Sequence, residues 1–165
     1  MDLTMKNEPI HTNGTPPALG ETFPEFCLLD THGNEVCSKD LLGRISVISI
    51  VPDITTSVCS TQTRRFTEGV GAMDGVDLYT VSTNEAKEFE EWSKEQDLSL
   101  EAITDPKGVL GQKLGLHVED AGIMARSVFV LDKDNKIIYE QVLEEQTNEP
   151  AYDPVEEIVK SELNK

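Results

Sequence analysis

The segment Ile45–Val51 (ISVISIV) constrains the fold more than any other part of the chain. Its apolar residues are all β-branched, which is typical of a central strand whose two faces are both covered. A second segment of this kind, Val76–Val81 (VDLYTV), is expected to be its partner in the sheet. The stretch from Val58 to about Ala72 has helical character, so these segments predict a β-α-β order.

The remaining chain predicts a mixed central β-sheet with helices on both faces, an α/β fold. We expect strands at Phe26–Asp30, Glu35–Cys37, Ser127–Leu131 and Lys136–Gln141, a short helix capped by Ser38, and helices at Glu85–Gln96 and Pro154–Leu163. The first 13 residues are expected to form an N-terminal β-hairpin. No repeat or linker interrupts residues 1–165, which we interpret as a single domain.

Charge and composition narrow the possible partners and the location. The chain carries 31 acidic and 14 basic residues, and this formal charge of -17 disfavours binding to nucleic acid or to an anionic membrane surface. The same charge favours neutral substrates over anionic ones. The sequence starts without the apolar run of a secretory signal, and no later run is long enough to span a bilayer. Three cysteines fit a reducing compartment in which thiols stay free, so we expect a cytoplasmic protein.

The segment from Pro52 to Cys59 (PDITTSVC) carries the clearest chemical signal. It follows the carboxyl end of the predicted central strand and opens a helix, which is where open α/β sheets place their sites. A cysteine in the first turn of a helix lies near unpaired N–H groups and the positive end of the helix dipole, and both favour the nucleophilic thiolate. The hydroxyl of Thr56, three residues earlier, can donate one hydrogen bond and accept another, which suits the orientation of a peroxide.

The run PDITTSVCSTQTRRF resembles the active-site segment of the peroxiredoxins, and is most similar to that of the bacterial thiol peroxidase subfamily. The similarity extends to Ala125-Arg126 before SVFVLD and to Asn148-Glu149-Pro150. It implies a thioredoxin-like fold, with Cys59 as the peroxidatic cysteine, Thr56 as its hydroxyl partner and Arg126 as the guanidinium that stabilises the thiolate. Pro52 and Val58 would shape the substrate site. The resemblance implies no cofactor and a homodimer, and the scattered histidines and cysteines predict no metal site.

One position departs from this family. The resolving cysteine that follows an aromatic residue on the next helix is replaced by Ser93, directly after Trp92. A serine hydroxyl cannot form a disulfide with a sulfenic acid, so either the mechanism uses one cysteine or another thiol substitutes. Cys27 and Cys37 are the candidates within the chain, although neither lies in a motif and each is interpreted as a small apolar residue.

We therefore expect a thiol-dependent peroxidase that reduces hydrogen peroxide and organic hydroperoxides. The sulfenic acid of Cys59 would be reduced by a thioredoxin-like protein or a low-molecular-weight thiol. The alternative is a peroxide-sensing binding protein with poor turnover, which the loss of the resolving cysteine keeps open.

Overall fold

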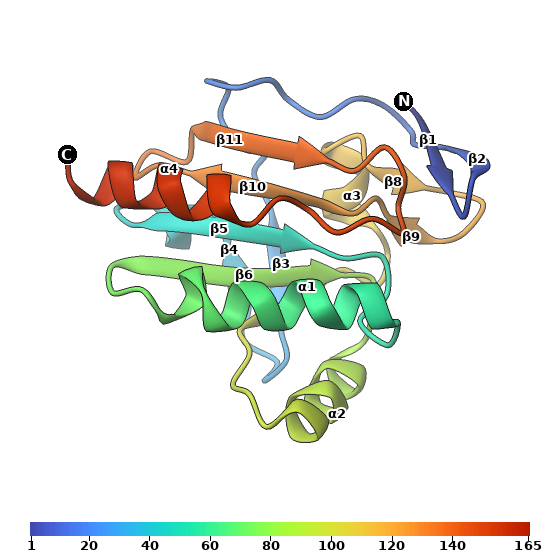
Figure 1. The fold of residues 1–165 in the computed structure, drawn as a ribbon, viewed down its shortest axis with the longest axis horizontal. Coiled ribbons are helices and arrows are strands. Elements are labelled where there is room, and N and C mark those ends of the chain that lie inside the picture. Colours follow the sequence, from blue (N-terminus) through green and yellow to red (C-terminus); the bar gives the residue numbers. More distant parts are fainter.

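A seven-stranded mixed sheet forms the centre of the computed structural model, which describes residues 1–165 (Figure 1). The strands lie in the order β11-β10-β5-β6-β7-β3-β4, with β5, β6 and β7 parallel and the other pairs antiparallel. The strands are β1 Asp2–Met5, β2 Glu8–His11, β3 Cys27–Asp30, β4 Glu35–Cys37, β5 Ile45–Ile50, β6 Val76–Ser82, β7 Ala102–Thr104, β8 His117–Val118, β9 Ile123–Met124, β10 Ser127–Leu131 and β11 Ile137–Val142. The helices are α1 Ser57–Glu68, α2 Ala86–Gln96, α3 Val109–Lys113 and α4 Asp153–Leu163, with 3-10 turns η1 Ser38–Leu41 and η2 Val70–Ala72.

Strand β5 is buried along its whole length, as its sequence predicts. Alternate side chains point to opposite faces of a strand, so Ile45 and Val47 join one apolar cluster while Ile48 and Ile50 join another. Both faces of the sheet are therefore covered at β5. The predicted α/β fold, with a mixed central sheet flanked by helices, is confirmed.

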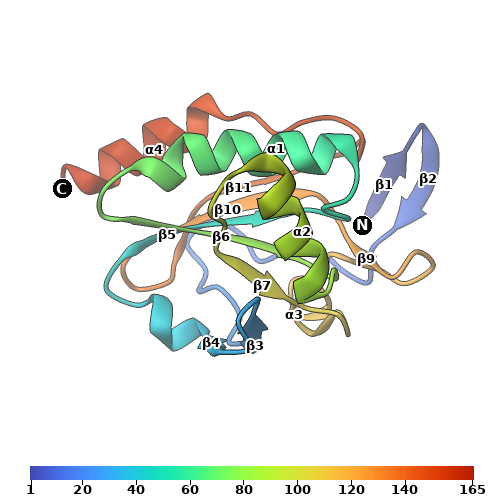
Figure 2. The same cartoon turned by 90° about the horizontal axis from the view of Figure 1, so that it is seen from below.

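The helices divide between the two faces of the sheet. Helices α1 and α4 lie side by side on one face, and α3 lies on the other (Figures 1 and 2). Phe66 of α1 and Val155 and Val159 of α4 pack on the first face, whereas Leu110 and Leu114 of α3 belong to the cluster on the second. No helix combines the length and the apolar character needed to cross a membrane.

The predicted N-terminal hairpin is present as β1 and β2, and it lies at the end of the molecule toward which β5 and β6 run (Figure 1). Its turn uses Lys6 and Asn7 at φ of 52° and 66°, the left-handed conformation that a tight hairpin turn requires. Hydrogen bonds tie β1 to the segment after β11, because the Thr4 N–H donates to the Glu144 carbonyl and the Gln146 N–H donates to the Thr4 carbonyl, each at 2.8 Å.

Several boundaries differ from the sequence-based expectations. Helix α1 ends at Glu68, and after Gly69 the chain continues as the 3-10 turn η2 instead of one helix to Ala72, because glycines weaken a helix. Ser38 does not cap a helix but is the first residue of η1, whose N-cap is Cys37. Strands β7, β8 and β9 and helix α3 were not predicted, since elements of two to five residues are too short to show a periodic pattern.

Candidate active site

Cys59 lies in the first turn of α1, just beyond the carboxyl end of β5, as the sequence predicts. The chain leaves β5 through Val51 and Pro52 and reaches the helix N-cap at Thr56, whose backbone is extended. The side chain of Cys59 is fully buried, and the backbone N–H of Asp53 points at its sulfur at 3.5 Å. The turn before the helix therefore directs a hydrogen-bond donor at the sulfur, in addition to the helix dipole.

Arg126 contacts the same sulfur from the neighbouring strand. It directly precedes β10, and the antiparallel register that pairs Ser127 with Ile50 brings it to the carboxyl end of β5. Its Nη2 lies 3.3 Å from the Cys59 sulfur, and Arg126 is only 3% exposed. Two positions that are far apart in the sequence thus form one buried pair.

Two glutamines hold the Arg126 guanidinium in place. Nη1 donates to Oε1 of Gln62 at 3.0 Å, and Nε donates to the backbone carbonyl of Gln146 at 2.7 Å. The Oε1 atom of Gln146 also accepts the backbone N–H of Arg126. Gln62 is itself fixed, because its amide nitrogen donates to Oγ of Ser49 at 3.0 Å.

Sequence reasoning identified neither glutamine. Gln62 follows Cys59 by three residues on α1, so helical spacing alone would have placed the two on the same side of the helix. Gln146 lies in the segment after β11 and contacts Arg126 only through tertiary folding, so no local sequence pattern predicts this contact.

The hydroxyl proton of Thr56 is engaged by the backbone of the loop before α1. Its Oγ1 donates to the backbone carbonyl of Asp53 at 2.8 Å, and the residue is exposed. With its proton engaged, the hydroxyl oxygen keeps its lone pairs free to accept a hydrogen bond from a ligand. The expected hydroxyl group is therefore close to Cys59 in the chain and presented as an acceptor.

The loop before α1 is fixed by Asp53 and Asn84. The Ile54 N–H donates to Oδ1 of Asn84 at 2.8 Å, and Nδ2 of Asn84 donates to Oδ1 of Asp53 at 3.0 Å. Partial burial raises the pKa of Asp53, but hydrogen bonds from Thr55 and Asn84 outweigh this effect and hold the pKa below its usual value. The carboxylate thus stays charged and accepts hydrogen bonds from Thr55 and Asn84.

All five predicted site residues line one hollow of about 460 Å³. These residues are Cys59, Thr56, Arg126, Pro52 and Val58. The hollow is completed by residues of the N-terminal hairpin, of β9 and the turn before it, and of the segment after β11, among them Met5, Lys6, Ala121, Ile123, Gln146 and Thr147. The sulfur and the guanidinium therefore face a space that is large enough for a small molecule, and the hairpin forms part of its wall.

Glu145 binds the N-terminal hairpin to the segment after β11. Its carboxylate accepts hydrogen bonds from the Thr147 hydroxyl, the Thr4 hydroxyl and the backbone N–H groups of Lys6 and Asn7. Hydrogen bonds from the Thr147 side chain and from the Asn7 and Thr147 backbone lower the pKa of Glu145 to about 2. Glu145 directly precedes Gln146, so one short segment holds both the hairpin and the guanidinium.

Helix α2 packs against Cys59 through its apolar side chains. Phe89 and Trp92 are buried in an apolar cluster with Cys59, so both are core residues. The indole N–H of Trp92 donates to Oγ of Ser60 at 2.8 Å. Ser93, the position expected for the resolving cysteine, is half-buried on the same helix.

The interpretation of Cys27 and Cys37 as free, ordinary apolar thiols is wrong in this structure. The two residues lie opposite each other on β3 and β4 and form a disulfide, which leaves Cys59 as the free cysteine. Their sulfurs and a carboxylate oxygen of Glu35 lie within 4.8 Å of one another, but sulfurs bonded to each other are not available as thiolate ligands. The expectation of no metal site stays a prediction.

Comparison with solved structures gives the class of the fold. A peroxiredoxin-like protein from Aquifex aeolicus superposes with a TM-score of 0.88 at 29% identity, covering 97% of this chain and 96% of that one. A thiol peroxidase from Chromobacterium violaceum superposes with a TM-score of 0.84 over 98% and 96% of the two chains, and at 14% identity it supports the fold alone. The fold is therefore the thioredoxin-like fold of the peroxiredoxins.

Comparison of sequences gives the family. Residues 19–140 match the AhpC/TSA family. The thiol peroxidase of Staphylococcus saprophyticus is 40% identical over 153 residues, covering 92% of this chain and 93% of that protein. The thiol peroxidase of Bacillus subtilis is 32% identical over 158 residues, covering 94% and 95%. The chain belongs to the AhpC/TSA family, and the resemblance in its active-site segment is confirmed at the level of the family.

Proposed function

We propose that the chain, a peroxiredoxin-type oxidoreductase, reduces hydrogen peroxide and organic hydroperoxides through Cys59. One observation carries this proposal. Arg126 is buried beside the Cys59 sulfur, and no carboxylate lies within ion-pair distance of it. A buried cation is costly without a counter-charge, so the site favours an anion at the sulfur. That anion is the thiolate, the nucleophilic form of cysteine.

The reaction starts with attack of the Cys59 thiolate on one peroxide oxygen. A sulfur–oxygen bond forms, the O–O bond breaks, and the second oxygen leaves with the substrate's remaining group and takes up a proton as water or alcohol. Cys59 becomes a sulfenic acid, so the sulfur is oxidised by two electrons and the peroxide is reduced by two.

Three groups of the chain are suited to position the peroxide for this displacement. The Arg126 guanidinium offers donors to the oxygen that becomes negative as the O–O bond breaks. The Asp53 N–H, 3.5 Å from the sulfur, is a further donor at the same place. The Thr56 oxygen can accept the hydrogen bond of the peroxide O–H, because its own proton is engaged by the Asp53 carbonyl.

The walls of the hollow fit small neutral substrates. Pro52 and Val58 line the hollow together with Cys59, and Met5 and Ile123 are among its other apolar residues. Apolar walls exclude water and leave room for the carbon chain of an organic hydroperoxide. The net charge of -17 does not oppose a neutral peroxide as it would an anion.

Reduction of the sulfenic acid is assigned to an external thiol, either of a thioredoxin-like protein or of a small molecule. Ser93 cannot resolve it. Cys27 and Cys37 are bonded to each other on β3 and β4. Strands β6 and β7 lie between β5 and this pair. At about 4.8 Å a strand, three steps across the sheet separate Cys27 from the site by about 14 Å. The cytoplasmic location and the homodimer stay predictions.

A peroxide sensor with poor turnover is the second candidate, and the serine at position 93 favours it. Peroxide consumption with thioredoxin, glutaredoxin or a small thiol as reductant separates the two. An enzyme consumes many equivalents of peroxide with at least one reductant, and Cys59→Ser abolishes this consumption. Cys27→Ser/Cys37→Ser is the matched control and should retain it. A single stoichiometric turnover with every reductant would favour the sensor instead.

A further inference from the structure

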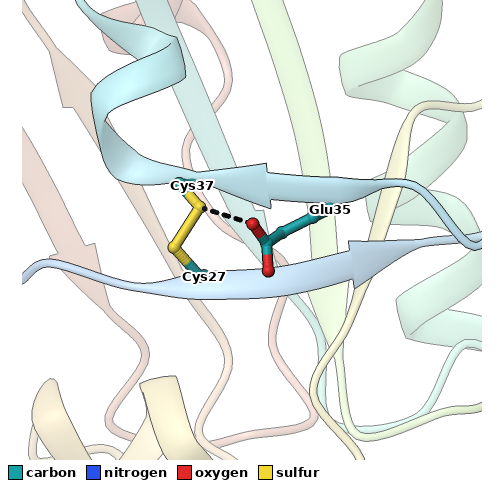
Figure 3. Close-up of side chains that lie close together, drawn as sticks. All are labelled: Cys27, Glu35 and Cys37. Carbon is teal, nitrogen blue, oxygen red and sulfur yellow. Dashed lines mark hydrogen bonds between the residues drawn. A yellow bond between two sulfur atoms is a disulfide. The ribbon is translucent and has the colours of Figure 1, made fainter.

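The Cys27–Cys37 disulfide lies at the edge of the central sheet, outside the candidate active site. It joins directly opposed residues of β3 and β4, and β4 is the last strand of the sheet (Figure 3). Cys27 is exposed, whereas Cys37 is buried at 4% exposure. An external thiolate can therefore reach the sulfur of Cys27, and the sulfur of Cys37 is the one that would leave.

The surface around the disulfide is hollowed and carries two cations. Lys39 and Lys113 line this open hollow of about 400 Å³ together with both cysteines, and Glu25 is the one acidic residue that lines it. The Lys113 ammonium is held in place, because its Nζ donates to the backbone carbonyl of Glu25 at 2.6 Å. On a chain of net charge -17, two lysines beside a disulfide provide a local site for an incoming thiolate, or for a small thiol that carries carboxylates.

Glu35 supplies a partner for the reduced form. Its Oε1 lies 3.6 Å from the Cys37 sulfur, as the dashed line in Figure 3 marks. A disulfide sulfur carries no proton, so this contact can be a hydrogen bond only when Cys37 is a thiol that donates to the carboxylate. Glu35 thus stabilises the protonated, reduced state of the residue that leaves.

We propose that Cys27 and Cys37 form a second redox centre, a dithiol–disulfide pair that exchanges with external thiols and works independently of Cys59. In the first step an external thiolate bonds to the Cys27 sulfur, the S–S bond breaks, and Cys37 departs and takes up a proton. A second external thiolate then attacks the mixed disulfide and releases Cys27, which also takes up a proton. In sum, two external thiols are oxidised to one disulfide and the protein disulfide gains two electrons and two protons.

The first test uses the Cys59→Ser variant, so that failure of the peroxidase proposal does not affect it. Protein purified without reductant is expected to show no alkylated cysteine after unfolding. Native protein treated with dithiothreitol before alkylation is expected to show two. If the pair opens only in denaturant, or if both thiols are free before reduction, the proposal is overturned.

The second test addresses the polarity of the pair. In the Cys59→Ser background, Cys37→Ser leaves only the exposed Cys27, and Cys27→Ser leaves only the buried Cys37. With glutathione disulfide, mass spectrometry should show the mixed disulfide forming at Cys27 about tenfold faster than at Cys37. Equal rates, or a faster reaction at Cys37, would contradict the assignment of Cys27 as the attacked sulfur.

The third test addresses Glu35. In a glutathione redox buffer, Glu35→Ala should shift the equilibrium of the pair toward the disulfide by about threefold, because the released thiol loses an acceptor at an exposed position. Glu8→Ala is the control, since Glu8 is an exposed glutamate of β2 that lines neither hollow. An unchanged equilibrium in Glu35→Ala would remove Glu35 from the proposal.

Discussion

The Nη2 atom of Arg126 lies 3.3 Å from the sulfur of Cys59, and no carboxylate pairs with this buried guanidinium. The other partners of Arg126 are neutral oxygens of Gln62 and Gln146. The sulfur is therefore the group that can supply the counter-charge. This relationship connects the burial of the Arg126 side chain with the reactivity of Cys59.

Removal of the guanidinium charge should slow the oxidation of Cys59. For Arg126→Gln, we expect the second-order rate constant with hydrogen peroxide to fall by about 100-fold, the usual effect of losing a donor to a developing anion. Arg44→Gln is the control, because Arg44 pairs with Asp77 on the surface and does not line the hollow. Circular dichroism should show that both variants fold. An unchanged rate constant in Arg126→Gln would exclude the role proposed for Arg126.

The Thr56 hydroxyl should matter as an acceptor for the substrate. Thr56→Val is expected to lower the peroxide rate constant by about tenfold, the value of one hydrogen bond lost from a reacting complex. Thr56→Ser should keep most of the rate because it keeps the hydroxyl. Thr61→Val is a matched control, since the Thr61 hydroxyl donates to the Ser57 carbonyl on the exposed side of α1. Equal rates for Thr56→Val and wild type would leave Thr56 as a structural residue only.

Gln62 should affect the reaction indirectly, because its neutral amide holds the Arg126 guanidinium without neutralising its charge. In Gln62→Glu, a carboxylate would stand where the amide oxygen lies 3.0 Å from Nη1 of Arg126. This carboxylate would compete with the thiolate as counter-ion, so we expect a peroxide rate about tenfold below that of Gln62→Met. Gln112→Glu adds the same charge at an exposed position and should leave the rate unchanged. If Gln62→Glu reacts as fast as wild type, the Cys59 thiolate is not the counter-ion of Arg126.

Glu145 should make the docking of the N-terminal hairpin dependent on pH. Its pKa is lowered from 4.5 to about 2, chiefly by the Thr147 hydroxyl and the Asn7 N–H. A group whose pKa is lower in the folded state stabilises that state fully above its ordinary pKa, and loses this effect as the pH falls through the folded value. The hairpin should therefore stay docked at pH 4 and loosen as the pH approaches about 2.

Nuclear magnetic resonance can follow this transition through the amide signal of Asn7. A midpoint near 2 is the expected result, and a midpoint near 4.5 would show that the carboxylate is not engaged. In Glu145→Gln the acid transition should disappear. Glu144→Gln is the control, because Glu144 holds the hairpin through its backbone carbonyl and not through its side chain.

The sequence predicts the residues around the reactive sulfur better than the residues that hold them in place. Cys59, Thr56 and Pro52 belong to one continuous segment, so a local pattern specifies them together. Arg126 is recognised by resemblance, and its contact with Cys59 depends on the antiparallel pairing of β10 with β5. Gln146 contacts Arg126 across 20 residues of sequence, and the hairpin is held by hydrogen bonds between segments about 140 residues apart, as between Thr4 and Glu145. No local pattern encodes such contacts.

The disulfide could have been expected from the predicted strands. Phe26–Asp30 and Glu35–Cys37 flank a turn, and in a hairpin the residue numbers of opposed pairs have a constant sum. Leu29 pairs with Glu35, so Cys27 must lie opposite Cys37. Directly opposed side chains on neighbouring strands are close enough for a disulfide. Each cysteine considered separately looks like an ordinary strand residue, and only the register brings them together.

Cys59 is expected to take an oxygen atom from peroxide before any other residue does. Wild-type protein would be exposed to an equimolar amount of hydrogen peroxide, quenched over time with dimedone and analysed by peptide mass spectrometry while peroxide is measured in parallel. The predicted result is a sulfenic acid adduct confined to Cys59 that forms in step with peroxide loss, with no peroxide loss in Cys59→Ser. Peroxide loss at an equal rate in Cys59→Ser, or peroxide loss while Cys59 stays unmodified, would contradict the proposed function.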